Sequence, residues 1–155
     1  MKADASLAKT YPQVYEMVEF HNKGKAPHWT DYVSKDLVLA EVTPGQVVWE
    51  MEVKESHCNQ LGNLHGGCVA TLIDICTSFV TLAHEGKSKW RSMGVSTDLS
   101  VSYFLGIPAG ETIRIVCTAN RIGKNLASIR SMIYNSNGQI CYSGSHTKFN
   151  IDSRL

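Results

Sequence analysis

The chain has 155 residues, about the length of one domain. Apolar residues make up 43% of it and charged residues 19%, with only four prolines. This composition excludes a disordered or low-complexity chain and can supply a buried core. The formal net charge is +1, from 15 Lys and Arg against 14 Asp and Glu, so we expect no broad positive surface for nucleic acid. The prediction is one domain over residues 1–155.

The N-terminal segment and the cysteines indicate the cellular location that we expect for the protein. The first 13 residues, MKADASLAKTYPQ, lack the apolar stretch of a secretory signal, and no apolar run of about 18 residues is evident, so membrane insertion is not expected. Five cysteines, an odd number without a CxxC pair, favour reduced thiols over a disulfide scaffold. We expect an intracellular, cytoplasmic protein. The basic residues of the opening segment leave a mitochondrial location as an alternative.

The N-terminal half is predicted to contain two helices and a hairpin. An amphipathic helix is expected over residues 10–24, within a helical extension that spans residues 1–35. Two apolar stretches flank the turn Thr43-Pro44-Gly45-Gln46 and predict a hairpin over residues 37–53. Residues 68–83 are apolar on most sides, without Gly or Pro, which is typical of a buried helix.

The C-terminal half is predicted to be all strand. Four β-rich segments lie at residues 95–104, 111–122, 126–135 and 139–151. The sequences between them contain turn-forming residues, so we expect consecutive hairpins in an antiparallel meander. A long helix on one face of an antiparallel sheet is an α+β architecture.

A polar stripe crosses the buried helix. Thr71, Asp74, Ser78 and Thr81 recur at i, i+3, i+7 and i+10, so they share one narrow face with Asp74 in its middle. The stripe marks either a functional carboxylate or an ordinary solvated face of the helix.

Two glycines precede this helix and suggest an oxyanion site. Gly66 and Gly67 let another molecule approach the backbone, and the free N–H groups of a helix N-terminus favour negative charge on an oxygen. Close packing of the helix on the sheet is the alternative reason for the pair. Asp74 lies about 12 Å further along the axis, at 1.5 Å per residue, so it is too far to serve the same carbonyl. A two-fold related helix could bring the Asp of one chain to the glycines of another.

Several strings of the sequence resemble one family. They are NQLGNLHGG, an Asp nine residues after its His, GVSTDLSVSYF, GETIRIVCTANRIGKNLA and the closing GSHTKF. Together they resemble the hotdog-fold acyl-CoA thioesterases, and within these the PaaI-like group and its acyl-CoA thioesterase 13 (Them2) type. The resemblance implies an antiparallel sheet wrapped around a long central helix. It also implies hydrolysis of fatty or aryl acyl-CoA to the free acid and CoA, without metal or cofactor, since CoA belongs to the substrate.

The resemblance also assigns catalytic roles to residues. It implies that Asn59 and the backbone N–H of Gly66 polarise the thioester carbonyl. Asp74 of the neighbouring subunit would then activate water, with Ser96 assisting. Donors fixed at a developing oxyanion and a positioned general base each contribute about 10²-fold or more to the rate.

The same resemblance implies which residues bind substrate. His65 and Gly67 would shape the turn around the carbonyl. Arg121, Lys124 and Asn125 would lie near the nucleotide part of CoA, although loop residues of this kind are equally often plain solvated side chains. The partners implied are acyl-CoA and further copies of the chain, as a dimer or a dimer of dimers.

Other assignments of the same residues are open. A cysteine nucleophile at Cys68 or Cys76 is less favoured, because a thiol in an apolar helix is usually inert. A zinc site from His57, Cys58, His65 and Cys68 lacks a usual ligand spacing. The fold also permits a non-catalytic acyl-CoA sensor, or a hydratase acting on enoyl thioesters. Asn59 and Asp74 favour the thioesterase over both.

Overall fold

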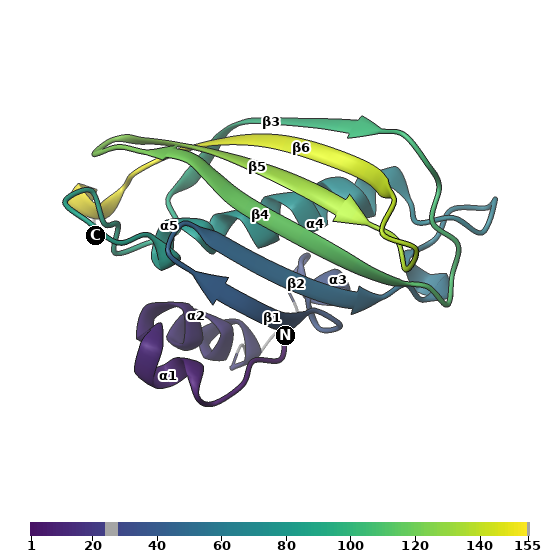
Figure 1. The fold of residues 1–155 in the computed structure, drawn as a ribbon, viewed down its shortest axis with the longest axis horizontal. Helices are drawn as coiled ribbons and strands as arrows, with labels where there is room; N and C mark the ends of the chain where they lie inside the picture. The colour runs from purple at the N-terminus through teal and green to yellow at the C-terminus, as the bar shows by residue number, and fades with distance from the viewer. Residues whose placement is uncertain (24–27, 155) are drawn as a thin grey trace.

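The computed structural model describes residues 1–23 and 28–154, and a single antiparallel sheet of six strands wraps one face of a central helix (Figure 1). The strands are β1 Val38–Thr43, β2 Gln46–Glu52, β3 Val95–Tyr103, β4 Thr112–Ile122, β5 Leu126–Tyr134 and β6 Ile140–Phe149. Their order in the sheet is β1-β2-β4-β5-β6-β3. The predicted α+β hotdog fold is confirmed, including the hairpin turn at residues 43–46.

One predicted pairing is wrong. Turn residues between β3 and β4 suggested a hairpin, but β3 pairs with β6 at the edge of the sheet, while β4, β5 and β6 form the meander. The connection after β3 is held elsewhere, because Phe104 N–H donates to the Cys141 carbonyl and Leu64 N–H donates to the Ile107 carbonyl. The turn residues between β3 and β4 are compatible with a hairpin, but the non-local pairing of β3 with β6 determines the observed topology.

The central helix differs in its bounds from the prediction of residues 68–83. It is α4, Gly66–Ser78, followed after Phe79 by the short α5, Val80–Ala83. The residues 66–83 are long and apolar enough to cross a membrane by length and composition alone, so the statement that no such run exists is wrong. However, 72% of this stretch is buried inside the protein, as in a core helix.

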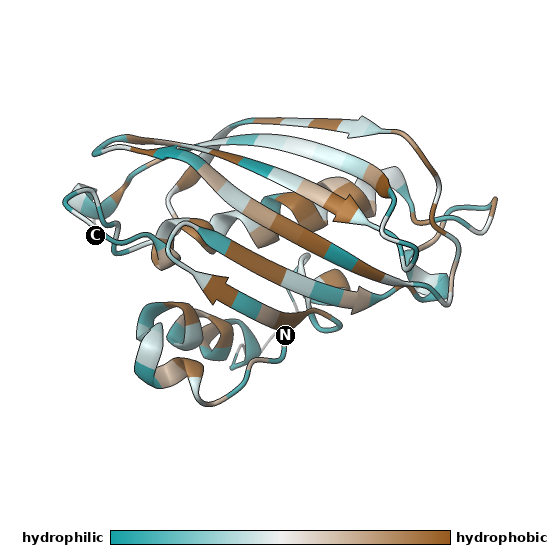
Figure 2. Cartoon of the chain, viewed as in Figure 1, coloured by the Kyte–Doolittle hydropathy of each residue, from teal (hydrophilic) through white to brown (hydrophobic). Residues whose placement is uncertain are grey.

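The core lies between α4 and the concave face of the sheet. Alternate residues of the strands point toward the helix, and hydrophobic residues accordingly alternate along β2, β4 and β5 (Figure 2). Phe79 packs edge-to-face on Trp49, with ring centroids 4.9 Å apart. The largest fully buried side chains are those of Trp49, Trp90, Phe79, Leu37, Met51 and Leu72.

The N-terminal segment is helical, as expected. It contains α1 Leu7–Thr10, α2 Pro12–Asn22 and α3 Asp31–Ser34, and two single turns of 3-10 helix occur elsewhere, at Glu55–His57 and Asp152–Arg154. The helix expected over residues 10–24 is α2, with Tyr11 as its N-cap, and residue 24 lies outside the described residues. Val14 and Val18 are buried, and the backbone of Lys2 bridges to β1, so this extension is tied to the sheet.

α4 packs closely against the sheet at Gly144 of β6. A Cβ atom there would lie 2.7 Å from Cγ2 of the fully buried Ile73, next to Asp74. Only glycine leaves room for the helix at this height. The position of Asp74 over the sheet therefore depends on the missing side chain of Gly144.

We expect Gly144→Ala to lower the free energy of unfolding by about 1–3 kcal/mol, because the extra methyl group overpacks a closed core. Urea unfolding of the variant measures this. Gly123→Ala is the matched control, since its Cβ would meet its nearest neighbour at an ordinary 3.4 Å. Equal stability of the two variants would contradict the close packing inferred at Gly144.

Candidate active site

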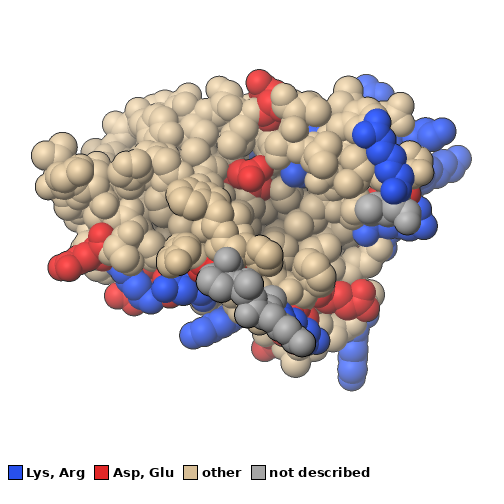
Figure 3. All heavy atoms as spheres, turned by 180° about the vertical axis from the view of Figure 1, so that it is seen from behind, with Lys and Arg blue, Asp and Glu red and all other residues tan. Residues whose placement is uncertain are grey.

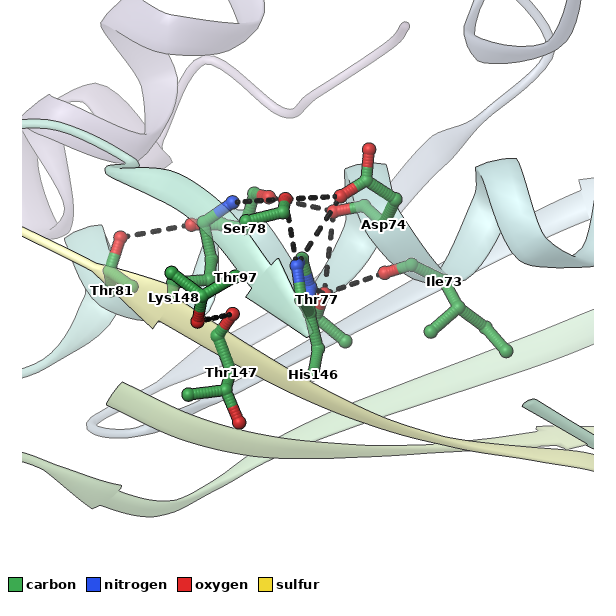
Figure 4. A network of polar contacts seen from close by, with 10 residues as sticks. Ile73, Asp74, Thr77, Ser78, Thr81, Thr97, His146, Thr147 and Lys148 are labelled. Carbon is green, nitrogen blue, oxygen red and sulfur yellow. Dashed lines mark hydrogen bonds and ion pairs between the residues drawn. The ribbon is translucent and has the colours of Figure 1, made fainter. Parts of the chain in front are cut away.

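A chain of polar contacts joins α4 to strands β3 and β6 beneath it (Figure 4). The hydroxyl of Ser96 donates to Oδ1 of Asp74 over 2.9 Å, and Nε2 of His146 lies 2.9 Å from the same hydroxyl oxygen. Nε2 of His146 is also 3.4 Å from Asp74 Oδ1. The predicted pair Asp74 and Ser96 is thus brought together in one chain, with a histidine behind it.

His146 is buried on the side away from solvent. Its side chain is fully covered, and burial lowers its pKa to about 4, with the Lys148 ammonium as a second cause. The ring is therefore neutral at pH 7. The Ser96 hydroxyl, which donates to Asp74, lies against Nε2 of the ring. The Thr77 hydroxyl covers the other nitrogen, 2.6 Å from Nδ1.

Asp74 combines a fixed position with access to water. Its side chain is 43% exposed, whereas that of His146 behind it has no exposed surface. One carboxylate oxygen is held by Ser96, and the buried ammonium of Lys148 lies 3.4 Å from the Ser96 oxygen. Burial lowers the pKa of Lys148, and the nearby Asp74 carboxylate opposes that shift. A carboxylate held from behind and open in front is suited to accept a proton from water.

Sequence reasoning did not assign His146, Lys148 or Thr77 to the site. The residues pointing inward from β6 alternate, and positions 144, 146 and 148 are Gly, His and Lys where a core strand would carry apolar side chains. That pattern of buried polar residues is the signal that could have found them.

The side chain of Asn59 is fixed by hydrogen bonds to the backbone of its own loop, which precedes α4. Oδ1 of Asn59 accepts the N–H of Leu61 over 2.9 Å and that of Asn63 over 3.3 Å. The carbonyl end of the amide therefore closes the loop, and its NH₂ end is the group left to donate to a substrate oxygen.

The turn His65-Gly66-Gly67 forms the start of α4. His65 is the N-cap, and its Nδ1 accepts the N–H of Gly67 over 2.9 Å. Gly66 is the first helical residue, so its N–H has no partner within the helix. Tyr103 of β3 donates its hydroxyl hydrogen to the Gly66 carbonyl over 3.0 Å. Within the described part of the chain the Gly66 N–H has no acceptor, so the turn presents a donor beside a capping imidazole.

Gly66 and Asp74 are not brought together in one chain. Asp74 lies eight positions after Gly66 in one continuous α-helix, about 12 Å along the axis. One chain therefore presents two half sites, a donor turn at the start of α4 and a carboxylate two turns later.

Comparison of the sequence with known proteins shows which family has these residues. The sequence profile of the thioesterase superfamily matches residues 61–142, more than half of the chain. The human protein named acyl-coenzyme A thioesterase 13 is 35% identical over 113 residues, which are 72% of this chain and 78% of the human one. The chain belongs to the thioesterase superfamily.

Solved structures agree with this assignment. Zebrafish thioesterase superfamily member 2 superposes on this thioesterase with a TM-score of 0.76 at 30% identity, covering 93% of this chain and 97% of the zebrafish chain. The PaaI protein of Escherichia coli, at 16% identity, shares the fold, with a TM-score of 0.71 over 92% of this chain and 98% of its own. The resemblance inferred from the sequence is confirmed, and the protein is a thioester hydrolase.

The cysteines of the thioesterase do not resemble activated nucleophiles. Burial raises the pKa of Cys68 to about 11 and that of Cys76 well above its usual range, so both are protonated thiols at neutral pH. The residues considered for zinc are also engaged elsewhere: His57 Nδ1 accepts the Lys54 N–H, and His65 Nδ1 caps α4. Within residues 1–23 and 28–154 no three His, Cys, Asp or Glu side chains gather as a metal site.

The basic turn of the thioesterase lies at the opposite end of the sheet from Gly66. Arg121, Lys124 and Asn125 surround the β4–β5 turn, whose Gly123 carbonyl accepts the indole N–H of Trp90 from the loop after α5. Asn150 also donates to the Lys124 carbonyl. Lys and Arg side chains gather at this end, which carries the C-terminus (Figure 3). One chain therefore does not place this turn beside its own donor turn.

We expect His146 to make stability depend on pH. Its folded pKa of about 4 lies below the ordinary 6.5, so the unfolded chain binds the proton more readily. The stabilisation from keeping His146 neutral is complete above pH 6.5 and is lost as the pH falls toward 4. At pH 5 this loss is about 2 kcal/mol.

The measurement is urea unfolding at pH 7.5 and pH 5 for the wild type and His146→Gln. The variant should lose about 2 kcal/mol less between the two pH values, whatever its stability at pH 7.5. An identical pH dependence would show that His146 is not held neutral.

Proposed function

We propose that this thioesterase hydrolyses acyl-CoA thioesters with fatty or aryl acyl groups, releasing the free acid and CoA. The observation that carries the proposal is the exposed Asp74 carboxylate, fixed by Ser96 and backed by the neutral His146. The name of the human relative, acyl-coenzyme A thioesterase 13, supports acyl-CoA as the substrate class. The mechanism uses only groups of the chain and water.

In the proposed mechanism water attacks the thioester carbonyl carbon. Asp74 takes a proton from the water as its oxygen bonds to carbon, and Ser96 keeps the carboxylate aligned. The carbonyl oxygen becomes an oxyanion, stabilised by the Gly66 N–H and the Asn59 amide. Collapse breaks the carbon–sulfur bond, and the proton held by Asp74 leaves with the CoA sulfur as a thiol. His146 contacts Ser96, Asp74 and Thr77 and takes no part in the proton transfer, so it is a positioning residue.

A second copy of the chain completes this site in the proposal. β3 is the edge of the sheet beside Asp74, and its nine residues are exposed except for the half-buried Val101. An unpaired edge with exposed apolar side chains, among them Val95, Leu99 and Tyr103, favours pairing with another strand. A two-fold pairing would bring Asp74 of one copy toward Gly66 of the other. Two such dimers would form the expected tetramer.

The basic turn is proposed to bind the CoA phosphates across the same interface. Arg121 and Lys124 lie at the far end of the sheet from Gly66 of their own chain, so they would serve the substrate of the partner's donor turn. The exposed position of the turn makes these contacts sensitive to salt. Asn125 would add a neutral hydrogen bond.

The first test is thiol release from acetyl-, hexanoyl-, myristoyl-, palmitoyl- and phenylacetyl-CoA. We expect the wild type to release CoA and Asp74→Asn to lower kcat by at least about 10²-fold, because the amide cannot accept the proton from water. The matched control is Glu52→Gln, which changes an exposed carboxylate on β2 in the same way. Near-normal kcat in Asp74→Asn would remove Asp74 from the mechanism.

Two further assays on the same substrates and on crotonyl-CoA distinguish hydrolysis from the other classes of function. Tight acyl-CoA binding in calorimetry without thiol release would make the protein a sensor. Formation of 3-hydroxyacyl-CoA from crotonyl-CoA without thiol release would make it a hydratase. Either result overturns the proposed hydrolysis.

The shared site predicts that activity depends on the dimer. Leu99→Lys places charges along the β3 edge, so we expect sedimentation to show dissociation and kcat to fall with it. Leu126→Lys changes another exposed leucine, at the start of β5 and away from that edge, and should leave both unchanged. A fully active monomer would contradict a site built from two chains.

A further inference from the structure

The loop after α5, residues 84–94, is fixed to one end of the sheet. Its Trp90 side chain is fully buried, although connecting loops normally lie on the surface. The Asp152 carboxylate of the C-terminal segment accepts the Arg91 backbone N–H and the Ser92 hydroxyl hydrogen, each over 2.7 Å. Loop and C-terminal segment lie together at the end of the sheet that carries the β4–β5 turn (Figure 1). The loop therefore has a defined position beside that turn.

Three consecutive carbonyl groups of the β4–β5 turn are held from outside the hairpin. The Gly123 carbonyl accepts the indole N–H of Trp90 over 2.8 Å. The Lys124 carbonyl accepts the side-chain NH₂ of Asn150 over 3.0 Å, and the Asn125 carbonyl accepts the backbone N–H of Asn150 over 2.8 Å. Two residues distant from the turn in sequence therefore fix its backbone.

These held carbonyls determine where the N–H groups of the turn point. In a trans peptide the N–H is directed opposite to the C=O of the same unit, so the N–H groups of Lys124 and Asn125 point away from Trp90 and Asn150. Among the described residues neither N–H has an acceptor. The side chains of Lys124 and Asn125 are exposed, as is that of Arg121. The turn therefore offers backbone and side-chain donors suited to the oxygens of a phosphate group.

We propose that Trp90 is a positioning residue, which acts through the Gly123 carbonyl to hold the β4–β5 turn in the shape that binds a phosphate group of the substrate. The inference rests on the proposed function, with the CoA phosphates at this turn. Trp90 is fully buried, so it does not touch the substrate. Without the indole N–H the Gly123 carbonyl loses its donor, and the peptide unit that carries the Lys124 N–H is free to rotate.

The test removes the hydrogen bond and keeps the buried ring, in Trp90→Phe. The substrates are hexanoyl-CoA and the hexanoyl thioester of N-acetylcysteamine, which has the same thioester without any phosphate. A hydrogen bond of about 1 kcal/mol corresponds to about fivefold in affinity, so KM for hexanoyl-CoA should rise about fivefold while kcat stays within about twofold. For the truncated thioester, kcat/KM should change by less than about twofold.

Trp49→Phe is the matched control. Trp49 is as fully buried as Trp90, but its indole N–H has no partner in the part of the chain that the structure describes. Any loss of kcat/KM in this variant should be the same for both substrates. An equal loss for the two substrates in Trp90→Phe, or a loss in kcat alone, would show that Trp90 only supports the fold and would overturn the inference.

Asn150→Ala keeps the inference testable if Trp90→Phe does not fold. This variant removes the donor to the Lys124 carbonyl and leaves the backbone N–H of residue 150 in place. We expect KM to rise for hexanoyl-CoA and not for the truncated thioester, because the same turn loses its shape from the other side. An unchanged KM for hexanoyl-CoA would contradict a turn that is positioned from outside the hairpin.

A binding measurement separates this inference from the proposed hydrolysis. The probe is CoA itself, titrated in a calorimeter into the wild type, Trp90→Phe and Trp49→Phe. Binding that is about fivefold weaker in Trp90→Phe alone supports the inference even if no thioester is cleaved. Equal binding by the wild type and Trp90→Phe overturns it, and thiol release by the wild type would then leave the thioesterase function intact.

Discussion

The close contact of α4 with β6 determines the geometry of the catalytic centre. Gly144 has no side chain, so Ile73 of the helix can press against the strand, and the next residue, Asp74, comes within hydrogen-bond distance of Ser96. Since protein interiors are close-packed, a shift of one methyl group at this contact would move the carboxylate relative to the strand. The positions of Asp74 and Ser96 relative to each other therefore depend on this packing.

Polar side chains are buried behind the Asp74 carboxylate, which is unfavourable unless they are hydrogen-bonded. A buried imidazole without partners would be strongly unfavourable, but Thr77 and Ser96 occupy both nitrogens of His146. The neutral ring holds Ser96 in place without adding a competing charge near Asp74. Lys148, which is also buried, provides the positive charge on this side. Orientation and charge are therefore supplied by different residues of one strand.

Local patterns predicted most of the elements, because strand alternation, turn residues and helix periodicity are properties of neighbouring residues. The hairpin at residues 43–46 and the strands β4, β5 and β6 follow from them directly. The pairing of β3 with β6 joins Val95 to Phe149, more than fifty residues away, and no local pattern specifies such a contact. Asp74 and Ser96 came from motif resemblance, whereas His146 was missed because its role exists only once β6 lies under α4.

The straight helix α4 explains why a single chain is an incomplete catalyst. A rigid helix fixes Gly66 and Asp74 two turns apart, and no side-chain rotation closes a gap of about 12 Å. In the proposed dimer one chain would therefore hold the thioester carbonyl at its donor turn while the other chain supplies the base. Neither half of the site can move toward the other within one chain, because both are fixed on the same helix.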